Sequence, residues 1–357
     1  MTQNTILIPS YQPNSRLPAL VRDLYDDGFR HILVVDDGSE ESYQSLFGIS
    51  VAWGATVIHH EENRGKGAAL KTGMAKAREL FPNDPGIITA DADGQHLPKD
   101  IRRVSEQLCR EPDSLVLGVR DFDQENVPWK SRFGNKITRT FFRLTSGHAL
   151  KDTQTGLRGI PSALVPKMLE IEGDRYEYEM HVLEDLAGSV PFAEVPIETV
   201  YEDRNSGSHF RPVADSARVY SRPLKFMVSS LSSSVLDIFL YWILLLILPF
   251  ELALSITLAT VIARTISGVV NYLINNYWCF KSKGRLRSSG LRYGILFLTQ
   301  MGLSAALVTL VTKALSNAVV AKMLVDSLLF FFSYQAQKHW VFREKEGAHG
   351  KRTEALA

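Results

Sequence analysis

The sequence carries one segment, Ile87-Ile88-Thr89-Ala90-Asp91-Ala92-Asp93-Gly94-Gln95-His96, in which an apolar run ends abruptly at two carboxylates and an amide. At the end of an extended strand, residues at i, i+2 and i+4 share one face, so Asp91, Asp93 and Gln95 are predicted to lie together. Such oxygen donors suit a Mg²⁺ or Mn²⁺ ion that bridges substrate phosphates. Paired Asp residues also serve as turn caps, so other parts of the sequence are needed to distinguish a metal site from a capped turn.

Up to about Tyr220, short β-branched runs alternate with segments of helical periodicity, which predicts βαβ units and a mainly parallel α/β sheet. The expected strands are Thr5–Ile8, His31–Val35, Ala55–His60, Gly86–Ala90 and Ser114–Val119, and the expected helices are Leu17–Tyr25, Gly67–Leu80 and Lys99–Leu108. Ligands of such sheets bind at the carboxyl ends of the strands. Three polar clusters fall at those ends, at residues 9–11, 36–39 and 91–93, so we expect a ligand crevice there.

The segment Asn63-Arg64-Gly65-Lys66-Gly67-Ala68-Ala69 is predicted to open a helix. Glycines let a backbone approach a ligand closely, and a helix N-terminus favours an anion. Lys66 is not followed by Ser or Thr in the frame of a Walker A loop. Taken alone, the segment fits a tight strand-to-helix turn as well as a phosphate contact.

Length and composition narrow the function classes. The 357 residues suggest about two domains, and the net charge of +1 argues against nucleic acid as the main partner. Cys109 and Cys279 form neither a disulfide framework nor a zinc motif, which fits a reducing compartment. The N-terminus is predicted to be a first strand and not a signal peptide.

From Leu224 to Phe342 the chain is apolar, and its charges gather in short gaps. Four segments are long enough to span a bilayer: Leu224–Leu248, Leu252–Ile274, Leu291–Leu315 and Val319–Ala336. Lys and Arg flank the set and fill its middle connection, whereas the two short connections have none. The positive-inside rule then predicts a multi-pass protein of the cytoplasmic (inner) membrane, with both termini and the preceding domain in the cytoplasm.

The apolar half contains an internal repeat. Asn276-Tyr277-Trp278-Cys279-Phe280-Lys281 parallels Lys338-His339-Trp340-Val341-Phe342-Arg343, at an offset of 62 positions. Under this offset Arg264 falls on Asp326, and Asp237 in the first span is a third candidate for a functional charge. Intramembrane charge is costly and suggests function. A structural ion pair, or for Asp237 an aqueous cleft without a role, remains the alternative.

Seven motifs occur in order: Ile8-Pro9-Ser10-Tyr11, Val35-Asp36-Asp37-Gly38-Ser39, Asn63-x-Gly65-x-Gly67-Ala68-Ala69, Asp91-Ala92-Asp93-Gly94-Gln95, Leu117-Gly118-Val119-Arg120, Ser131-Arg132-Phe133-Gly134-Asn135 and Asp152-Thr153-Gln154-Thr155-Gly156-Leu157-Arg158. Together they resemble the family 2 glycosyltransferases of GT-A fold, in particular the polyprenyl-phosphate branch of dolichol-phosphate mannose synthase. The apolar half resembles the four-span GtrA family, on Leu224-Lys225-Phe226 and the two Trp-x-Phe motifs. The resemblance implies a GT-A domain over 1–220 with a juxtamembrane helix, an all-α transmembrane domain over 221–342, and a cytoplasmic tail over 343–357.

The resemblance also implies roles for the matching residues. The nucleotide sugar would contact Pro9, Tyr11, Asp37, Lys66 and Asp91, while Asp93 and Gln95, with Asp91 beside them, would hold Mg²⁺ or Mn²⁺. The catalytic set would be Asp93, Arg120, Arg132 and Asp152, with the two arginines on phosphate. Thr155 would line the acceptor pocket. The acceptor phosphate would be bound by residues of a polar segment, Arg204, Ser208, His209 and Arg211, for which a solvated linker is the alternative interpretation. Gln12-Pro13 departs from the family's usual Asn-Glu, which leaves UDP and GDP donors both open.

These expectations predict an inverting, metal-dependent transfer of a sugar from a nucleotide sugar to polyprenyl (undecaprenyl) phosphate at the cytoplasmic face. The membrane domain would anchor the enzyme, and translocation of the lipid-sugar for cell-envelope glycan modification is left open, as is a homo-oligomer. One alternative is a processive polysaccharide synthase, although residues 1–220 lack the Gln-x-x-Arg-Trp motif of that class. The other is a lipid-sugar transporter with a non-catalytic, nucleotide-sensing domain.

Overall fold

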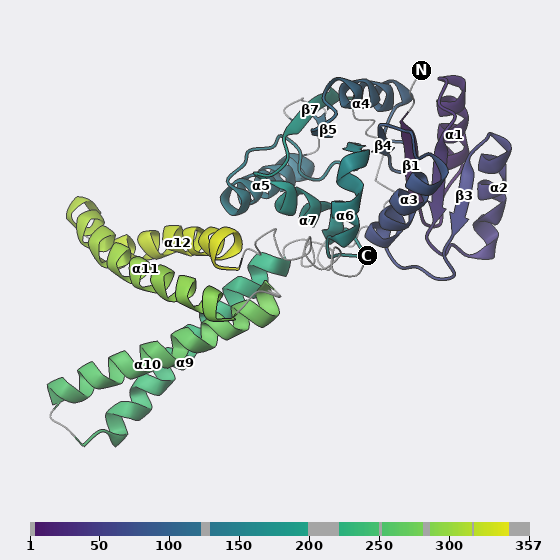
Figure 1. The fold of residues 1–357 in the computed structure, drawn as a ribbon. Coiled ribbons are helices and arrows are strands. Elements are labelled where there is room, and N and C mark those ends of the chain that lie inside the picture. Colours follow the sequence, from purple (N-terminus) through teal and green to yellow (C-terminus); the bar gives the residue numbers. More distant parts are fainter. Residues whose placement is uncertain are drawn as a thin grey trace, which may run out of the picture. The chain divides into compact units, whose positions relative to one another are not determined.

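The computed structural model describes residues 4–122, 129–198, 221–249, 252–280, 286–315 and 318–342 (Figure 1). The chain divides into two compact units between Val219 and Tyr220. The predicted juxtamembrane helix before Ser221 and the predicted tail 343–357 lie outside the described residues.

The first unit is built on a seven-stranded sheet in the order β3-β2-β1-β4-β6-β5-β7. Strand β6 is antiparallel to both of its neighbours, and the other pairs are parallel, which confirms the predicted mainly parallel α/β architecture. The strands are β1 (Thr5–Ser10), β2 (Ile32–Asp36), β3 (Thr56–His59), β4 (Gly86–Thr89), β5 (Leu115–Arg120), β6 (Arg158–Pro161) and β7 (Phe192–Ile197).

Helices cover both faces of this sheet, because successive side chains of its buried strands point to opposite sides. Leu7 and Leu33 join a core with α3 and α7, while Ile6 and Val34 join another with α1 and α4. The helices are α1 (Arg16–Asp26), η1 (Glu41–Tyr43), α2 (Gln44–Ala52), α3 (Lys66–Leu80), α4 (Pro98–Arg110), α5 (Trp129–Ser146), η2 (Ser162–Leu164), α6 (Val165–Glu170) and α7 (Glu177–Leu186).

The predicted strands and helices of this unit all form, with ends shifted by one or two residues. The elements missing from the prediction are η1, α2, α5, η2, α6, α7, β6 and β7. Strands β6 and β7 each contain a proline, at Pro161 and Pro196, which argues against a strand from sequence alone. Their place beside β4 and β5 is set by tertiary pairing.

The second unit is helical, as predicted. Its described elements are α9 (Ser221–Ile247), α10 (Leu252–Ile274), η4 (Asn275–Cys279), α11 (Leu286–Leu315), α12 (Ala318–Ala336) and η5 (Gln337–Val341). Helix α9 packs along α10, and α11 along α12, so the unit consists of a first hairpin (α9, α10, η4) and a second hairpin (α11, α12, η5) (Figure 1). Within the described residues, Leu224–Ile247 is the one segment that is long and apolar enough by itself to cross a membrane.

The predicted internal repeat is visible as matching structure. Both second helices end in a single π-helical turn, η4 and η5, at positions 62 residues apart. Tyr272 stacks on Phe342 with ring centroids 5.9 Å apart, and the repeat-equivalent pair, Tyr334 and Phe280, lies at 5.8 Å. Phe280 and Phe342, which are equivalent to each other, stack at 5.0 Å. The two hairpins therefore contact each other as a pseudo-twofold pair.

The first helices of the hairpins follow the same symmetry, with Leu224-Lys225-Phe226 matching Leu291-Arg292-Tyr293. The Phe226 ring lies 5.3 Å from Tyr334, and the Tyr293 ring lies 5.3 Å from Tyr272. Each of these contacts crosses from one hairpin to the other. The symmetry thus extends over both helices of each hairpin.

The ionisable residues of this unit are only partly placed. Arg264 Nη2 lies 3.6 Å from Asp237 Oδ2, which joins α10 to α9 within the first hairpin. The side chain of Asp326 lies outside the described residues, so a pair between it and Arg264 stays a prediction.

Candidate active site

The carboxyl ends of β1 and β2 lie side by side, since Ser10 pairs with Asp36 in the parallel register. Gln12 has a φ of 48°, a left-handed conformation that turns the chain sharply after β1. Its backbone N–H donates to Ser39 Oγ at 2.8 Å, which ties the loop after β1 to the loop after β2. Pro9 and Tyr11, which are predicted to contact the nucleotide, lie next to this connection, at the end of β1 and directly after it.

Asp37 organises the loop that opens α3. Its buried carboxylate accepts the backbone N–H of Arg64 at 3.0 Å and of Gly65 at 2.7 Å, and His60 Nδ1 lies 2.8 Å away. Gly65 has a φ of 103°, and a Cβ there would collide with the backbone of Asp174. Asp37 thus shapes the glycine loop, and the nucleotide contact expected of it stays a prediction.

Lys66, the first residue of α3, links three elements. Its Nζ lies 2.6 Å from Asp91 Oδ1, after β4, and 3.0 Å from Glu179 Oε2, on α7. Burial lowers the pKa of Lys66, but the two carboxylates outweigh burial and raise it above its ordinary value. Burial likewise raises the pKa of Asp91, and Lys66 more than reverses that, so the Asp91 carboxylate stays ionised.

Asp93, two positions beyond Asp91, has the opposite electrostatic environment. Burial and then the charge of Asp91 raise its pKa. Its Oδ1 accepts the backbone N–H of Gln95 at 3.0 Å, and its carbonyl accepts Arg16 Nη1 at 3.0 Å, so the turn after β4 is fixed at both sides. His96 Nδ1 accepts the N–H of Asp91 at 3.0 Å, and burial lowers the pKa of this ring, which favours neutral imidazole.

Arg120 ends β5 and is held by Asp152. The guanidinium binds the fully buried carboxylate through Nε at 2.6 Å and Nη2 at 3.1 Å, in the bidentate geometry that suits arginine. It also lies over the Phe122 ring, 4.9 Å from the centroid, while Arg132 Nε donates to the carbonyl of Phe122 at 3.1 Å. The two predicted phosphate-binding arginines therefore meet at Phe122.

The turn that precedes β6 closes the site from the other side. Gly156 lies so close to Asp91 that a Cβ would collide with the carboxylate, and its carbonyl accepts the hydroxyl of Thr89 at 2.7 Å. Thr155 is buried, and its Oγ1 accepts the N–H of Leu157 at 3.2 Å. Arg158 donates to the carbonyls of Thr155 and Glu179, which fastens this turn to α7.

These side chains gather carboxylates and cations around the ends of β4 and β5. Asp91, Asp93, Asp152 and Glu179 supply negative charge, and Lys66, Arg120 and Arg158 balance it. Among the described residues no three His, Cys, Asp or Glu side chains are grouped closely enough to hold a metal by themselves. One or two carboxylates with substrate phosphates are the usual donors of Mg²⁺, so the oxygens of Asp93 and Gln95 fit an ion shared with a diphosphate.

Comparison with known proteins identifies the group to which the chain is related. Residues 5–164 match the model of glycosyl transferase family 2, and residues 225–342 match the GtrA/DPMS transmembrane domain. The UDP-N-acetylglucosamine–dolichyl-phosphate N-acetylglucosaminyltransferase of Methanococcus voltae is 31% identical over 217 residues, which cover 56% of this chain and 86% of that protein. The chain belongs to glycosyl transferase family 2.

Two further relatives are similar in sequence to this family 2 chain. An uncharacterized protein of Methanocaldococcus jannaschii is 33% identical over 56% of this chain and 82% of its own length. The undecaprenyl-phosphate 4-deoxy-4-formamido-L-arabinose transferase of Pseudomonas fluorescens is 31% identical over 46% of this chain and 48% of its own. The first unit therefore has the GT-A fold of family 2, and the second is its GtrA-like membrane domain.

Solved structures that resemble this family 2 chain include two glycosyltransferases. Glucosyl-3-phosphoglycerate synthase of Mycobacterium tuberculosis, with Mn²⁺, UDP-glucose and phosphoglyceric acid, is 16% identical over 62% of this chain and 78% of that one, with a TM-score of 0.47. The mannosyltransferase of Pyrobaculum calidifontis, with GDP-Man and Mn²⁺, is 12% identical over 95% of this chain and 87% of that one, with a TM-score of 0.41.

Not every predicted site residue of this family 2 chain can be placed. Arg204, Ser208, His209 and Arg211, predicted to clamp the acceptor phosphate, lie outside the described residues. In contrast, Glu179 and His96 belong to the cluster although neither was predicted to have a role. His96 follows the Asp-x-Asp-x-Gln motif directly, so its proximity was foreseeable, whereas nothing in the sequence links Glu179 to Lys66.

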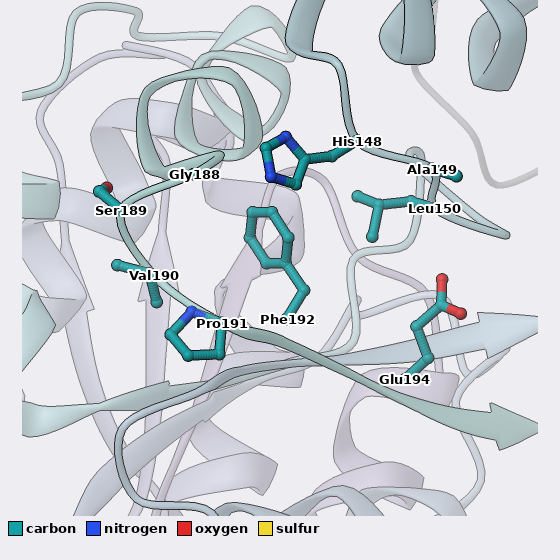
Figure 2. Close-up of a pocket in the computed structure, with 9 residues that line it drawn as sticks. All are labelled: His148, Ala149, Leu150, Gly188, Ser189, Val190, Pro191, Phe192 and Glu194. Carbon is teal, nitrogen blue, oxygen red and sulfur yellow. The ribbon is translucent and has the colours of Figure 1, made fainter.

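A separate hollow of about 600 Å³ lies away from these residues (Figure 2). His148 and Leu150 line it from the loop after α5, and Gly188, Phe192 and Glu194 line it from the segment that leads into and along β7. Figure 2 shows the Phe192 ring directed toward His148. None of the predicted donor-site residues of family 2 lines this hollow, and Pro191 faces it from the amino end of β7, opposite to the end where Arg120 lies.

Proposed function

We propose that the chain transfers a sugar from a nucleotide-sugar donor to a polyprenyl phosphate, with a divalent metal ion bound at Asp93. The observation that carries the proposal is the pairing of Lys66 with Asp91 beside Asp93, at the carboxyl end of β4 in a family 2 domain. The names of two relatives support the acceptor, since one is described as acting on dolichyl phosphate and the other on undecaprenyl phosphate.

The two carboxylates after β4 have separate tasks in this proposal. Asp91 forms an ion pair with Lys66 at 2.6 Å and lies against Gly156. It therefore holds the turn after β4 to the start of α3. The pKa of Asp93, in contrast, is raised by burial and by the charge of Asp91. A divalent ion held by Asp93, with Gln95 and Asp91 beside it, would neutralise the charge that develops on the leaving diphosphate.

The transfer breaks the bond between the anomeric carbon and the nucleoside diphosphate, and a phosphate oxygen of the lipid forms the new bond. That oxygen is already ionised near neutral pH, so no strong general base is needed. Direct displacement from the face opposite the leaving group inverts the anomeric centre. Arg120, oriented by Asp152 and Phe122, supplies a planar donor for phosphate, and Arg132 adds a second cation at the same aromatic residue.

The membrane domain would hold the enzyme at the bilayer, where the lipid acceptor is located. A polyprenyl chain resides in the bilayer, and the GtrA-like unit carries outward-facing apolar side chains, such as those of Leu231, Val235 and Trp242. The proposed orientation places both termini and the middle connection on the cytoplasmic side, where nucleotide sugars occur. Residues 1–220 then form the catalytic part, and residues 221–342 anchor it.

The test is transfer from radiolabelled UDP- and GDP-sugars to undecaprenyl phosphate by full-length protein in membranes, with the labelled product recovered in organic solvent. We expect one nucleotide series to be used, in the presence of Mg²⁺ or Mn²⁺ and not after chelation. Asp93→Asn should reduce the rate by about a hundredfold or more, because a lost metal ligand removes several kcal/mol of charge stabilisation.

Asp26→Asn is the matched control, because Asp26 is exposed at the end of α1, and its rate should equal that of the wild type. A rate of Asp93→Asn within threefold of the wild type at saturating Mg²⁺ would contradict the metal assignment. Label recovered in a water-soluble polymer would favour a processive synthase instead.

A further inference from the structure

His60 is a buried histidine to which the proposed reaction gives no role. Its side chain is 5% exposed, and its backbone N–H donates to the carbonyl of Asp36 at 2.9 Å, which continues the pairing of β3 with β2. Buried polar groups in folded proteins are hydrogen-bonded, so the partners of the two ring nitrogens indicate what this side chain holds together.

The imidazole of His60 joins two parts of the first unit. Its Nδ1 lies 2.8 Å from Asp37 Oδ1, and its Nε2 lies 3.0 Å from Thr72 Oγ1. An ionised carboxylate accepts hydrogen bonds and donates none, so Nδ1 donates to Asp37, and Nε2 of the neutral ring accepts the Thr72 hydroxyl. His60 therefore ties the loop after β2 to the second turn of α3.

Asp37 connects this histidine to the loop that leads into α3. The same carboxylate accepts the backbone N–H of Arg64 at 3.0 Å and of Gly65 at 2.7 Å. Lys66 follows Gly65 directly, and its Nζ lies 2.6 Å from Asp91 Oδ1. A shift of the Asp37 carboxylate would therefore move the residue whose side chain reaches the proposed donor site.

The neighbouring histidine, His59, forms a similar pair on the other face of the sheet, because successive side chains of a strand point to opposite sides. Its Nδ1 lies 2.9 Å from Asp36 Oδ2, but its side chain is 49% exposed, and its ring packs edge-on against Phe47 of α2. Asp36 also accepts hydrogen bonds from Ser39 and Gln44, which both follow β2. This pair therefore stabilises the segment after β2 on the side of α2.

We propose that His60 is a positioning residue for nucleotide-sugar binding, which acts through Asp37 on the loop that carries Lys66. The inference rests on the proposed function, in which the donor binds beside Lys66 and Asp91. Without His60, Asp37 would keep its two backbone donors but lose its link to α3. The effect should fall on donor affinity and not on the chemical step, because both ring nitrogens bind groups of the protein itself.

Two substitutions separate the two bonds of the ring. The Asn amide stands at about the distance of Nδ1 from the backbone and the Gln amide at about that of Nε2, so His60→Asn retains a donor for Asp37 and His60→Gln retains a partner for Thr72. Binding of UDP and of GDP with Mg²⁺ is measured by calorimetry on the full-length protein in detergent. We expect His60→Gln to weaken binding about tenfold, the effect of losing a hydrogen bond to a charged group, and His60→Asn about threefold.

Hydrogen–deuterium exchange on the same proteins without nucleotide gives a second readout. Peptides that contain Arg64 and Gly65 should exchange faster in His60→Gln than in His60→Asn, because the Asp37 carboxylate protects these two N–H groups. In the transfer assay, KM for the nucleotide sugar should rise with binding while kcat stays within twofold. Thr72→Val, which leaves the histidine in place, is the milder variant if His60→Gln folds poorly, and it should weaken binding about threefold.

His59→Gln is the matched control, because it alters the His–Asp pair on the side of α2, and its nucleotide affinity should stay within twofold of the wild type. The inference would be overturned by equal affinity of His60→Gln, His60→Asn and wild type, by faster exchange without weaker binding, or by a fall in kcat at unchanged KM. A wild type that binds neither UDP nor GDP would contradict the proposed function and this inference together, whereas wild-type binding with unaffected variants contradicts the inference alone.

Discussion

Two carboxylates that are two positions apart, Asp91 and Asp93, differ because Asp91 forms an ion pair with Lys66 at 2.6 Å, whereas burial and the charge of Asp91 dominate at Asp93. The pKa of Asp91 is lowered by Lys66 against the effect of burial, and the pKa of Asp93 is raised by burial and by Asp91. Groups whose surroundings move their pKa values apart commonly have different functions in one site. The pattern Asp-x-Asp shows two carboxylates, but which of them is neutralised by the protein itself depends on Lys66 and Glu179.

Glu179→Gln tests the role of the second partner of Lys66. Removing this charge leaves the lysine with one carboxylate, Asp91, at 2.6 Å, and alters its position at the start of α3. We expect KM for the nucleotide sugar to rise severalfold, with a smaller change in kcat, because Glu179 positions Lys66 and does not touch the reacting atoms. Glu170→Gln, exposed at the end of α6, should leave both constants unchanged. A fall in kcat at unchanged KM would place Glu179 in the chemical step.

Asp36 gives a prediction about pH. Burial raises the pKa of this carboxylate, but hydrogen bonds from Ser39, Gln44 and His59 outweigh burial and hold it below its ordinary value. A carboxylate with a lowered pKa in the folded state stabilises the fold above its unfolded pKa of about 3.9, and this is lost as pH falls through the folded value. Asp36→Asn should therefore exchange amide hydrogens faster in β2 at pH 6, and the difference should shrink below about pH 4. A difference that is constant or grows on acidification would contradict this assignment.

At the scale of elements, the site depends on how closely α7 approaches α3. Gly67 permits this, since a Cβ there would lie 2.6 Å from Tyr178 Cβ. Tyr178 is followed directly by Glu179, so the glycine also allows the bond to Lys66. The second glycine of the Gly-x-Gly motif is thus explained by helix packing, which the sequence suggested only as a close approach to a ligand.

Gly67→Ala should push the two helices apart. We expect a loss of about 1–3 kcal/mol in stability, the usual effect of overpacking, together with weaker nucleotide-sugar binding. Gly134→Ala is the control, because Gly134 lies within α5 with open space around its missing Cβ, and alanine there should be neutral or slightly stabilising. The measurement is the thermal midpoint of the full-length protein in detergent. If both variants melt alike, the α3–α7 contact does not limit the fold.

How much of this was predictable also differs between elements. The alternation of β-branched and helical segments predicted β1 to β5 with α1, α3 and α4, because buried parallel strands are apolar throughout. Strands β6 and β7 contain proline and pair through tertiary contacts, so local patterns missed them. The same limit applies to the site: Asp93 and Lys66 stand in local motifs, whereas Glu179 reaches Lys66 only through the packing of α7.

At the scale of the whole molecule, the two hairpins of the membrane unit are joined by Asn275 and Gln337. Changing either residue alone to leucine leaves the other amide buried without its partner, whereas changing both removes the mismatch. We expect each single change to lower the thermal midpoint, and the double change to lower it by less than the sum. Double-mutant cycles on such bonds between membrane helices give a coupling of about 0.6 kcal/mol on average and about 1.7 kcal/mol at most. Fully additive effects would show that this bond does not couple the hairpins.

A series of hydrogen bonds runs from Ser233 through Asn271 and Asn275 of the first hairpin to Gln337, Ser333 and Gln300 of the second, and its two halves match under the repeat. This symmetry has a consequence for how such a unit can arise and change. Two separate copies of one hairpin would make these same contacts as a homodimer, because an isologous interface places each contact on both partners. A homodimer, however, would carry the Asp237–Arg264 pair twice or not at all. Fusion into one chain allows the second copy to diverge, and in this chain Ser304 and Asp326 stand where the second hairpin would repeat Asp237 and Arg264, so the ion pair occurs in one half of an otherwise symmetric scaffold.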